Sequence, residues 1–231
     1  LTDRVASSQV NAKYAIKSNH SLEANYAFNY LKRRGEDEVN PFNAAFRAPG
    51  ILSKNIIGLA YNVKNPNDFY NMTFFGKQYL FSASQENIDG EKIEDVDFSG
   101  TGYGASLSVS PIKDLSIKAS YEKAYRIPES YELLGNGLFI RPNFNLQPEE
   151  SDNINLGTRL NTSFFSFKLT FDANFFYRKS IDFIRLKRPE GVFSEFDNIT
   201  NVSSTGIESG IKTLFNDKIE AQFNITYQDI I

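Results

Sequence analysis

Apolar and polar residues alternate with a period of two along most of this chain. The clearest example is FFSFKLTFDANFFYR, residues 164–178. One phase of this stretch carries Phe165, Phe167, Leu169, Phe171, Ala173, Phe175 and Tyr177, and the other carries Ser166, Lys168, Thr170, Asp172, Asn174, Phe176 and Arg178. Successive side chains of a β-strand point to opposite faces, so the pattern predicts a strand with one apolar face and one polar face.

The same alternation recurs along the chain, whereas the apolar spacing of three and four that marks a helix is nowhere sustained. We therefore predict an all-β chain of about ten strands. The predicted strands are residues 5–16, 22–31, 50–63, 68–82, 99–109, 115–126, 151–160, 164–181, 201–214 and 218–230. All of them are longer than the roughly five or six residues of an average soluble strand.

The predicted connections alternate in length. Short turns are expected at KSNHS, KNPN, SPIKD, NTS and FND, and long polar loops at about residues 32–49, 83–98, 127–150 and 182–200. A soluble sandwich has no reason to gather its long loops at one end, whereas an outer-membrane barrel has short periplasmic turns and long outer loops. The rhythm predicts an antiparallel up-and-down transmembrane β-barrel, with the aromatic phase in lipid and the polar phase toward the lumen.

Composition narrows the possible chemistry. The net charge is −3 with a pI near 5.4, which disfavours a nucleic-acid partner. The absence of cysteine removes disulfides, thiol nucleophiles and thiolate metal sites. No apolar run is long enough for a membrane-spanning helix.

Residues 118–159 read KASYEKAYRIPESYELLGNGLFIRPNFNLQPEESDNINLGTR. Proline lacks a ladder donor and glycine permits positive φ, so the middle of this run is expected to form a structured loop between two strands. The run resembles the barrel of TonB-dependent outer-membrane receptors. The resemblance is carried by Arg126, Pro128, Glu132, Leu133, Asn143, Leu146, Pro148, Glu149 and Ser151, with Phe144 where the family usually has Pro.

A second stretch, DNITNVSSTGIESGIKT at residues 197–213, is similar to the family's entry into a late barrel strand. Asn201, Ser204, Gly206 and Glu208 carry that similarity.

The resemblance implies a roughly 22-stranded barrel filled by an N-terminal plug, in the outer membrane of a Gram-negative bacterium. It implies uptake of a scarce nutrient, such as a ferric siderophore-like chelate, cobalamin or a glycan. The implied partners are the nutrient, the TonB complex acting through the plug, and outer-membrane lipid with lipopolysaccharide. No catalysis, cofactor or metal site is implied.

We expect residues 1–231 to be a single partial β-barrel domain, without the plug or a signal peptide. The chain opens on LTDRVASSQV, which has no basic and apolar leader, and it closes inside the predicted strand IEAQFNITYQDII. Unpaired strand edges cannot lie in lipid, so a fragment of a larger barrel is expected.

Ligand capture is expected in the long loops. Arg141, with Phe139 and Phe144 on either side, is the preferred contact because a guanidinium and aromatic rings can together hold an anionic chelate. Arg185 and Arg188 of RLKRPEG are further candidates. The basic residues of RLKRPEG and of LKRRG at 31–35 also fit contact with lipopolysaccharide phosphates.

Three other features have plainer interpretations. His20 is the only histidine and is expected to be a solvated turn residue. The acidic stretch 85–97 could hold a hard cation, but it fails the EF-hand spacing and fits a solvated loop better. Gly100, Gly102 and Gly104 share one strand face, where they would allow a bend or a close approach.

Two other classes of protein remain open from the residues alone. One is a complete ten-stranded outer-membrane porin or enzyme, and the other is a soluble β-sandwich adhesin or carbohydrate-binding module. The scarcity of histidine argues against an enzyme of the first class.

Overall fold

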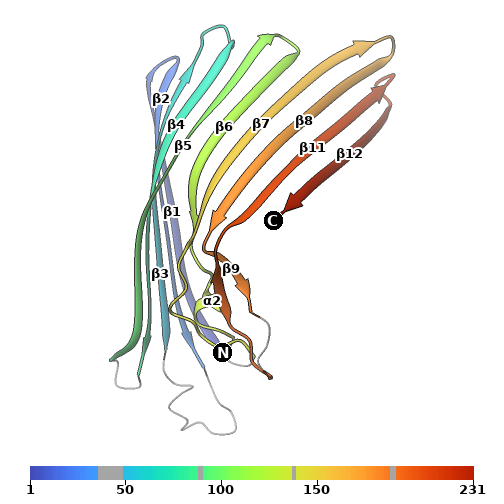
Figure 1. Ribbon diagram of the computed structural model, residues 1–231. Coiled ribbons are helices and arrows are strands. Elements are labelled where there is room, and N and C mark those ends of the chain that lie inside the picture. Colours follow the sequence, from blue (N-terminus) through green and yellow to red (C-terminus); the bar gives the residue numbers. More distant parts are fainter. Residues whose placement is uncertain (36–48, 88–90, 137–138, 188–190) are drawn as a thin grey trace.

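The computed structural model describes residues 1–35, 49–87, 91–136, 139–187 and 191–231. These residues form one ten-stranded antiparallel sheet in which each strand pairs with the next one along the chain (Figure 1). Its strands are β1 Thr2–Lys17, β2 His20–Arg34, β3 Gly50–Lys64, β4 Tyr70–Glu86, β5 Lys92–Ile112, β6 Leu115–Arg126, β7 Glu149–Phe164, β8 Phe167–Ile181, β11 Val202–Phe215 and β12 Ile219–Ile230.

A short helix and a small hairpin complete the described structure. The helix α2, Ser130–Leu133, lies in the β6–β7 connection, and the hairpin of β9, Phe183–Leu186, and β10, Phe196–Ile199, lies between β8 and β11. Within the described residues, no helix is long and apolar enough to cross a membrane.

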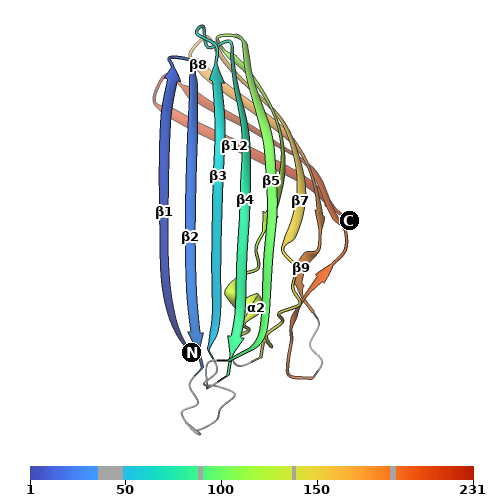
Figure 2. The same cartoon turned by 90° about the vertical axis from the view of Figure 1, so that its left-hand side faces the viewer.

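The sheet curves into an open wall, with β1 and β12 as its two edge strands (Figures 1 and 2). Tight turns join the strands at one end, and the long connections gather at the other end together with α2 and the small hairpin. This arrangement confirms the predicted all-β, antiparallel, up-and-down architecture of a partial barrel.

Each of the ten predicted strands is present, but some boundaries were wrong. We predicted a turn at residues 161–163, whereas the ladder between β7 and β8 continues to the pair Phe164↔Phe167. The turn is therefore Phe165 and Ser166, and Phe165 takes a positive φ of 50°. Strand β5 begins at Lys92 rather than near residue 99, because β4 pairs with its polar first half.

The two faces of the sheet follow the two sequence phases. On the outer face Phe171, Phe175 and Ile211 are exposed, as are Phe223 and Tyr227 of β12. The opposite phase lines the concave inner face with residues such as Asn25 and Asp172. An outer face with this many exposed apolar side chains fits contact with hydrocarbon.

The exceptional Phe176 on the polar phase is explained by its cross-strand partner. Phe176 pairs with Gly206 of β11, and a methyl group on that glycine would lie 2.4 Å from the phenyl ring and 2.5 Å from the carbonyl oxygen of Tyr227. The same arrangement of an aromatic ring against a cross-strand glycine recurs where Phe75 pairs with Gly104. A glycine in one strand thus leaves room for an aromatic ring in the next.

A small hydrophobic core closes the inner face at the long-loop end. Leu52 of β3 and Phe81 and Ala83 of β4 are buried there beneath Leu133 and Leu146 of the β6–β7 connection. The connection therefore folds back into the curve of the sheet, where Figure 1 shows α2.

Gly206→Ala is expected to lower the free energy of unfolding of the full-length receptor by about 1–3 kcal/mol, because the added methyl group meets a backbone oxygen that cannot step aside. Urea unfolding of the receptor in lipid vesicles measures this change. Gly58→Ala is the matched control, since its nearest neighbour outside the local chain would be 3.7 Å away. Equal stability of the two variants would contradict the close-packing explanation.

Candidate functional site

The β6–β7 connection, residues 127–148, lies at the long-loop end and contains the short helix α2. Its helix α2 begins with a capping box, in which the backbone N–H of Glu129 donates to the carboxylate of Glu132 at 2.6 Å. A capping box satisfies the exposed amides of a helix start, which lets so short a helix persist.

Two buried glutamates and the partly exposed Arg126 tie both ends of this connection together. Arg126 donates to Glu132 at 3.0 Å and to Glu149 at 2.8 Å, and the register pairs Arg126 with Glu149 at the ends of β6 and β7. The two glutamates are only 4% and 2% exposed. Glu149 also accepts from the backbone N–H of Ile184 at 2.8 Å, so the same carboxylate holds β9.

The remaining residues of the first family motif support the same loop. The side-chain amide of Asn143 donates to the carbonyl of Phe196 at 2.8 Å, which links the loop to β10, and its oxygen accepts from the N–H of Asn145. Pro128, Leu146 and Pro148 are buried. The motif residues of this loop are therefore buried or hydrogen-bonded, and they join the loop to the small hairpin.

Phe139 and Arg141 lie where this loop meets the segment before β10. The backbone N–H of Arg141 donates to Ser194 at 2.9 Å, and the N–H of Ser194 donates to Phe139 at 2.8 Å. The guanidinium of Arg141 lies 4.7 Å from the ring centroid of Phe193, which is within the range of a cation–π contact. Phe139 is 57% exposed.

The predicted ligand residues are thus only partly brought together. Arg185 lies on β9, opposite Asp197 of β10, in the hairpin next to Arg141. Phe144 is buried in the hydrophobic core, so it supports the loop from beneath. Arg188 lies outside the described residues. Sequence reasoning missed Phe193, although GVFSEF places an aromatic residue in the neighbouring long loop.

One basic residue of LKRRG already has partners. Arg33 donates two hydrogen bonds of 2.9 and 2.8 Å to the carboxylate of Asp3 on β1. It also donates to the carbonyl of Gly135 at 2.7 Å. It therefore ties the β6–β7 connection to the edge of the sheet.

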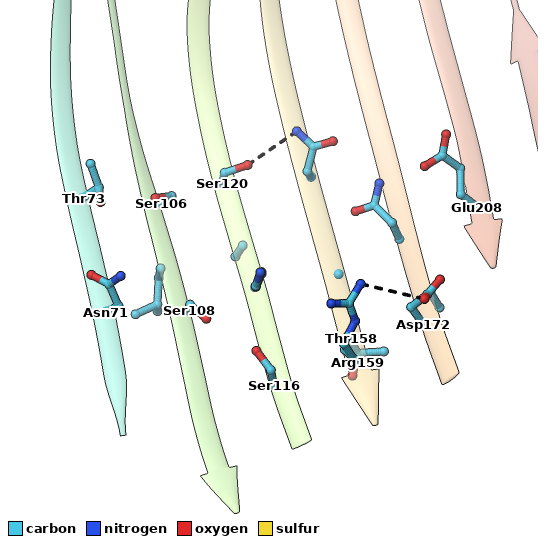
Figure 3. A pocket seen from close by; sticks show the side chains of 17 residues that line it. Asn71, Thr73, Ser106, Ser108, Ser116, Ser120, Thr158, Arg159, Asp172 and Glu208 are labelled. Carbon is cyan, nitrogen blue, oxygen red and sulfur yellow. Dashed lines mark hydrogen bonds and ion pairs between the residues drawn. The ribbon is translucent and has the colours of Figure 1, made fainter. Parts of the chain in front are cut away.

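The second family motif begins in the β10–β11 connection and continues along β11. Asn201 takes a positive φ of 58° just before the strand. The hydroxyl of Ser204 accepts from the side-chain amide of Gln228 at 2.7 Å, and Gly206 accommodates Phe176. Glu208 faces the polar hollow of the inner wall (Figure 3).

That hollow has a volume of about 510 Å³ and is lined mainly by small polar and charged side chains from β4 to β11. In Figure 3 the labelled serines lie on β5 and β6, whereas the charged Arg159, Asp172 and Glu208 lie on β7, β8 and β11. Arg159 and Asp172 lie 3.9 Å apart. A surface of this kind suits water or a second polar surface better than an apolar ligand.

Other polar clusters do not form a chemical centre. His20 is bonded to the hydroxyl of Tyr61 at 2.6 Å and stacks on its ring at the short-turn end, so it has a partner that the sequence did not reveal. No group of three or more His, Cys, Asp or Glu side chains is placed to hold a metal ion within the part of the chain that the structure describes.

Comparison with known families decides what this sheet belongs to. The family described as TonB dependent receptor-like, beta-barrel matches residues 2–230, which is nearly the whole chain. The chain belongs to the β-barrel family of TonB-dependent receptors. This family consists of transporters rather than enzymes, and its members lie in the outer membrane of Gram-negative bacteria.

Solved structures of such receptors share the fold at low sequence identity. The FrpB iron transporter from Neisseria meningitidis matches with a TM-score of 0.74 at 13% identity, over 99% of this chain and 36% of its own. The copper transporter OprC matches with a TM-score of 0.77 at 12% identity, over 98% of this chain and 38% of its own.

BauA, the ferric preacinetobactin receptor from Acinetobacter baumannii, matches with a TM-score of 0.61 at 16% identity, over 99% of this chain and 36% of its own. This chain therefore spans well under half the length of these receptors. No curated protein matches its sequence.

Glu149→Ala is expected to lower the free energy of unfolding by about 1–3 kcal/mol and to loosen the β6–β7 connection. The substitution leaves the N–H of Ile184 and one amino group of the Arg126 guanidinium without their hydrogen-bond acceptor. Urea unfolding and the rate of proteolysis within residues 127–148 of the full-length receptor measure both effects. Glu220→Ala, which removes an exposed pair with Lys212, is the control and should cost less than about 1 kcal/mol. Similar effects of both variants would argue against the buried network.

Proposed function

We propose that the receptor containing this chain takes up a scarce, anionic nutrient across the outer membrane, with a ferric siderophore-like chelate as the preferred class. The observation that carries the proposal is the pairing of Arg141 with Phe193 beside exposed Phe139 at the long-loop end. A fixed cation next to aromatic surface suits an anionic ligand that also has flat organic parts.

The surroundings of Arg141 support such a contact. Backbone hydrogen bonds on both sides of Ser194 fix the peptide that carries Arg141, and Glu149 fixes the hairpin that carries Arg185. A binding group on a fixed backbone loses less entropy on capture. Arg185 is proposed as a second cationic contact and Phe144 as the buried support, and Arg188 stays a candidate.

The rest of the chain would form the wall past which the nutrient moves and would contact the plug and the lipopolysaccharide. We propose that residues 1–231 are one partial barrel domain, whose polar inner face contacts the plug of the parent receptor. Energy would come from the TonB complex through that plug, and exposed loop cations would also meet lipopolysaccharide phosphates. This division of roles rests on the resemblance of the chain to its family.

The nature of the structural neighbours supports a metal-containing ligand. FrpB is described as an iron transporter, BauA as a ferric preacinetobactin receptor and OprC as a copper transporter. Cobalamin and glycans remain the alternative nutrients, and they would depend less on a loop guanidinium than an anionic chelate would.

Arg141→Ala in the full-length receptor is expected to weaken binding of the recognised chelate by about tenfold and so to lower its uptake at low chelate concentration, because one charge-assisted and one cation–π contact of the guanidinium are lost. Cells expressing each variant are tested for uptake of ⁵⁵Fe-loaded catecholate and hydroxamate siderophores, labelled cyanocobalamin and maltooligosaccharides, with and without a protonophore.

Lys218→Ala, at the opposite rim, is the control and should leave uptake unchanged. Energy-dependent uptake of a chelate that does not respond to Arg141→Ala would remove Arg141 from the site. Uptake of none of the chelates but of cobalamin or a glycan would overturn the preferred ligand class.

A further inference from the structure

Among the described residues, strand β5 has no paired strand along one edge over half its length. The strand contains 21 residues and pairs with β4 along nearly all of them, but its ladder with β6 begins only at Tyr103. Between described residues, the β5–β6 ladder gives Asp95–Thr101 no partner residue on β6. Figure 1 shows β5 running on toward the long-loop end past the end of β6.

The hydrogen bonds show which backbone groups are free. The N–H of Ser110 donates to Phe69, so the even-numbered residues of β5 direct their N–H and C=O groups toward β4. The register between the two strands is unbroken from Val109 to Glu94. The N–H and C=O groups of Asp95, Asp97, Ser99 and Thr101 therefore point away from β4, along the free edge.

This free edge lies in water rather than in lipid. The outer side chains of β5 are polar from Asp95 to Thr101 and become apolar at Tyr103, where pairing with β6 begins. Unpaired backbone groups in hydrocarbon would cost several kcal/mol each, so the change of side chains and the start of pairing mark the same boundary.

The edge is held in an extended form before any partner arrives. The ladder with β4 fixes one side of it, and on the inner face Phe98 packs against Tyr125 with ring centroids 5.2 Å apart. A strand that is already extended pays little entropy when another strand is added.

We propose that this edge, Asp95–Thr101, binds an extended basic polypeptide segment of an extracellular partner by strand addition. The charge of the edge favours this occupant. Glu94, Asp95 and Asp97 are exposed there, and Lys92 lies 3.6 Å from only one of them, Asp95. A second copy of the same edge would set acidic residues against acidic residues, which disfavours self-pairing.

Strand addition at this edge does not depend on which nutrient the receptor binds. The partner contributes main-chain hydrogen bonds for affinity and cationic side chains for selectivity. The edge-facing N–H and C=O groups belong to every second residue of β5, so they bond to every second residue of the partner strand.

The test uses the full-length receptor in detergent and a fluorescein-labelled ten-residue peptide of alternating lysine and valine, with fluorescence anisotropy as the readout. Saturable binding to the wild type is expected. Asp97→Pro should weaken it by about tenfold, because proline removes an edge-facing N–H without breaking the ladder to β4. Asp97→Asn, which keeps that N–H, should weaken it only about two- to threefold.

A peptide methylated at every backbone nitrogen keeps its charge and should not bind. Absence of wild-type binding, equal binding of the methylated peptide, or equal affinities of the Pro and Asn variants would overturn the proposal. So would light scattering that shows a wild-type dimer converted to a monomer by Asp97→Pro, because a second copy would then be the occupant. Heat-dependent gel migration confirms that each variant keeps a folded barrel.

Discussion

The dominant constraint on this chain is that a backbone amide inside hydrocarbon has no water to bond, so it must find another strand. Each strand from β2 to β11 of the ten-stranded sheet has a neighbour on both sides, and exposed outer aromatic side chains such as Phe171 and Phe175 lie along these paired stretches. Strand β5 shows the link most clearly, since its outer side chains turn apolar at Tyr103, where its second neighbour begins. The length of the strands, their register and the alternation of apolar and polar residues along them all follow from this pairing.

Much of the fold could be predicted from the sequence because lipid and lumen impose opposite demands on alternate residues. The apolar phase of residues 164–178 has a period of two that no helix produces, and the strand order follows once the connections alternate between short and long. The turn at Phe165 escaped prediction because an apolar residue with positive φ gives no turn signal. The position of Phe176 is understood only with its partner, Gly206, which lies thirty residues further along the chain.

The candidate site was predicted less completely, since it depends on contacts between loops. Arg126 and Glu149 could be recognised as motif residues, but their partners could not. Arg126 donates to Glu132 and Glu149, and Glu149 accepts from the N–H of Ile184, only once β6, β7 and β9 come together. Likewise Arg141 was expected beside Phe139 and Phe144, whereas its ring partner is Phe193. The backbone pairing around Ser194 decides that choice, and the sequence carries no periodic signal for it.

The central claim is that the aromatic phase of each strand faces hydrocarbon and the polar phase faces the enclosed lumen. These 231 residues lack cysteine. Single cysteines are placed at Phe171, Asp172, Asn174 and Phe175 of the full-length receptor, with any cysteine elsewhere in the receptor replaced by serine, and are spin-labelled and measured in lipid vesicles. The account predicts that labels at 171 and 175 are relaxed by oxygen dissolved in the bilayer, and that labels at 172 and 174 are relaxed by a water-soluble nickel chelate. Equal relaxation at all four positions, or the reverse alternation, would contradict it.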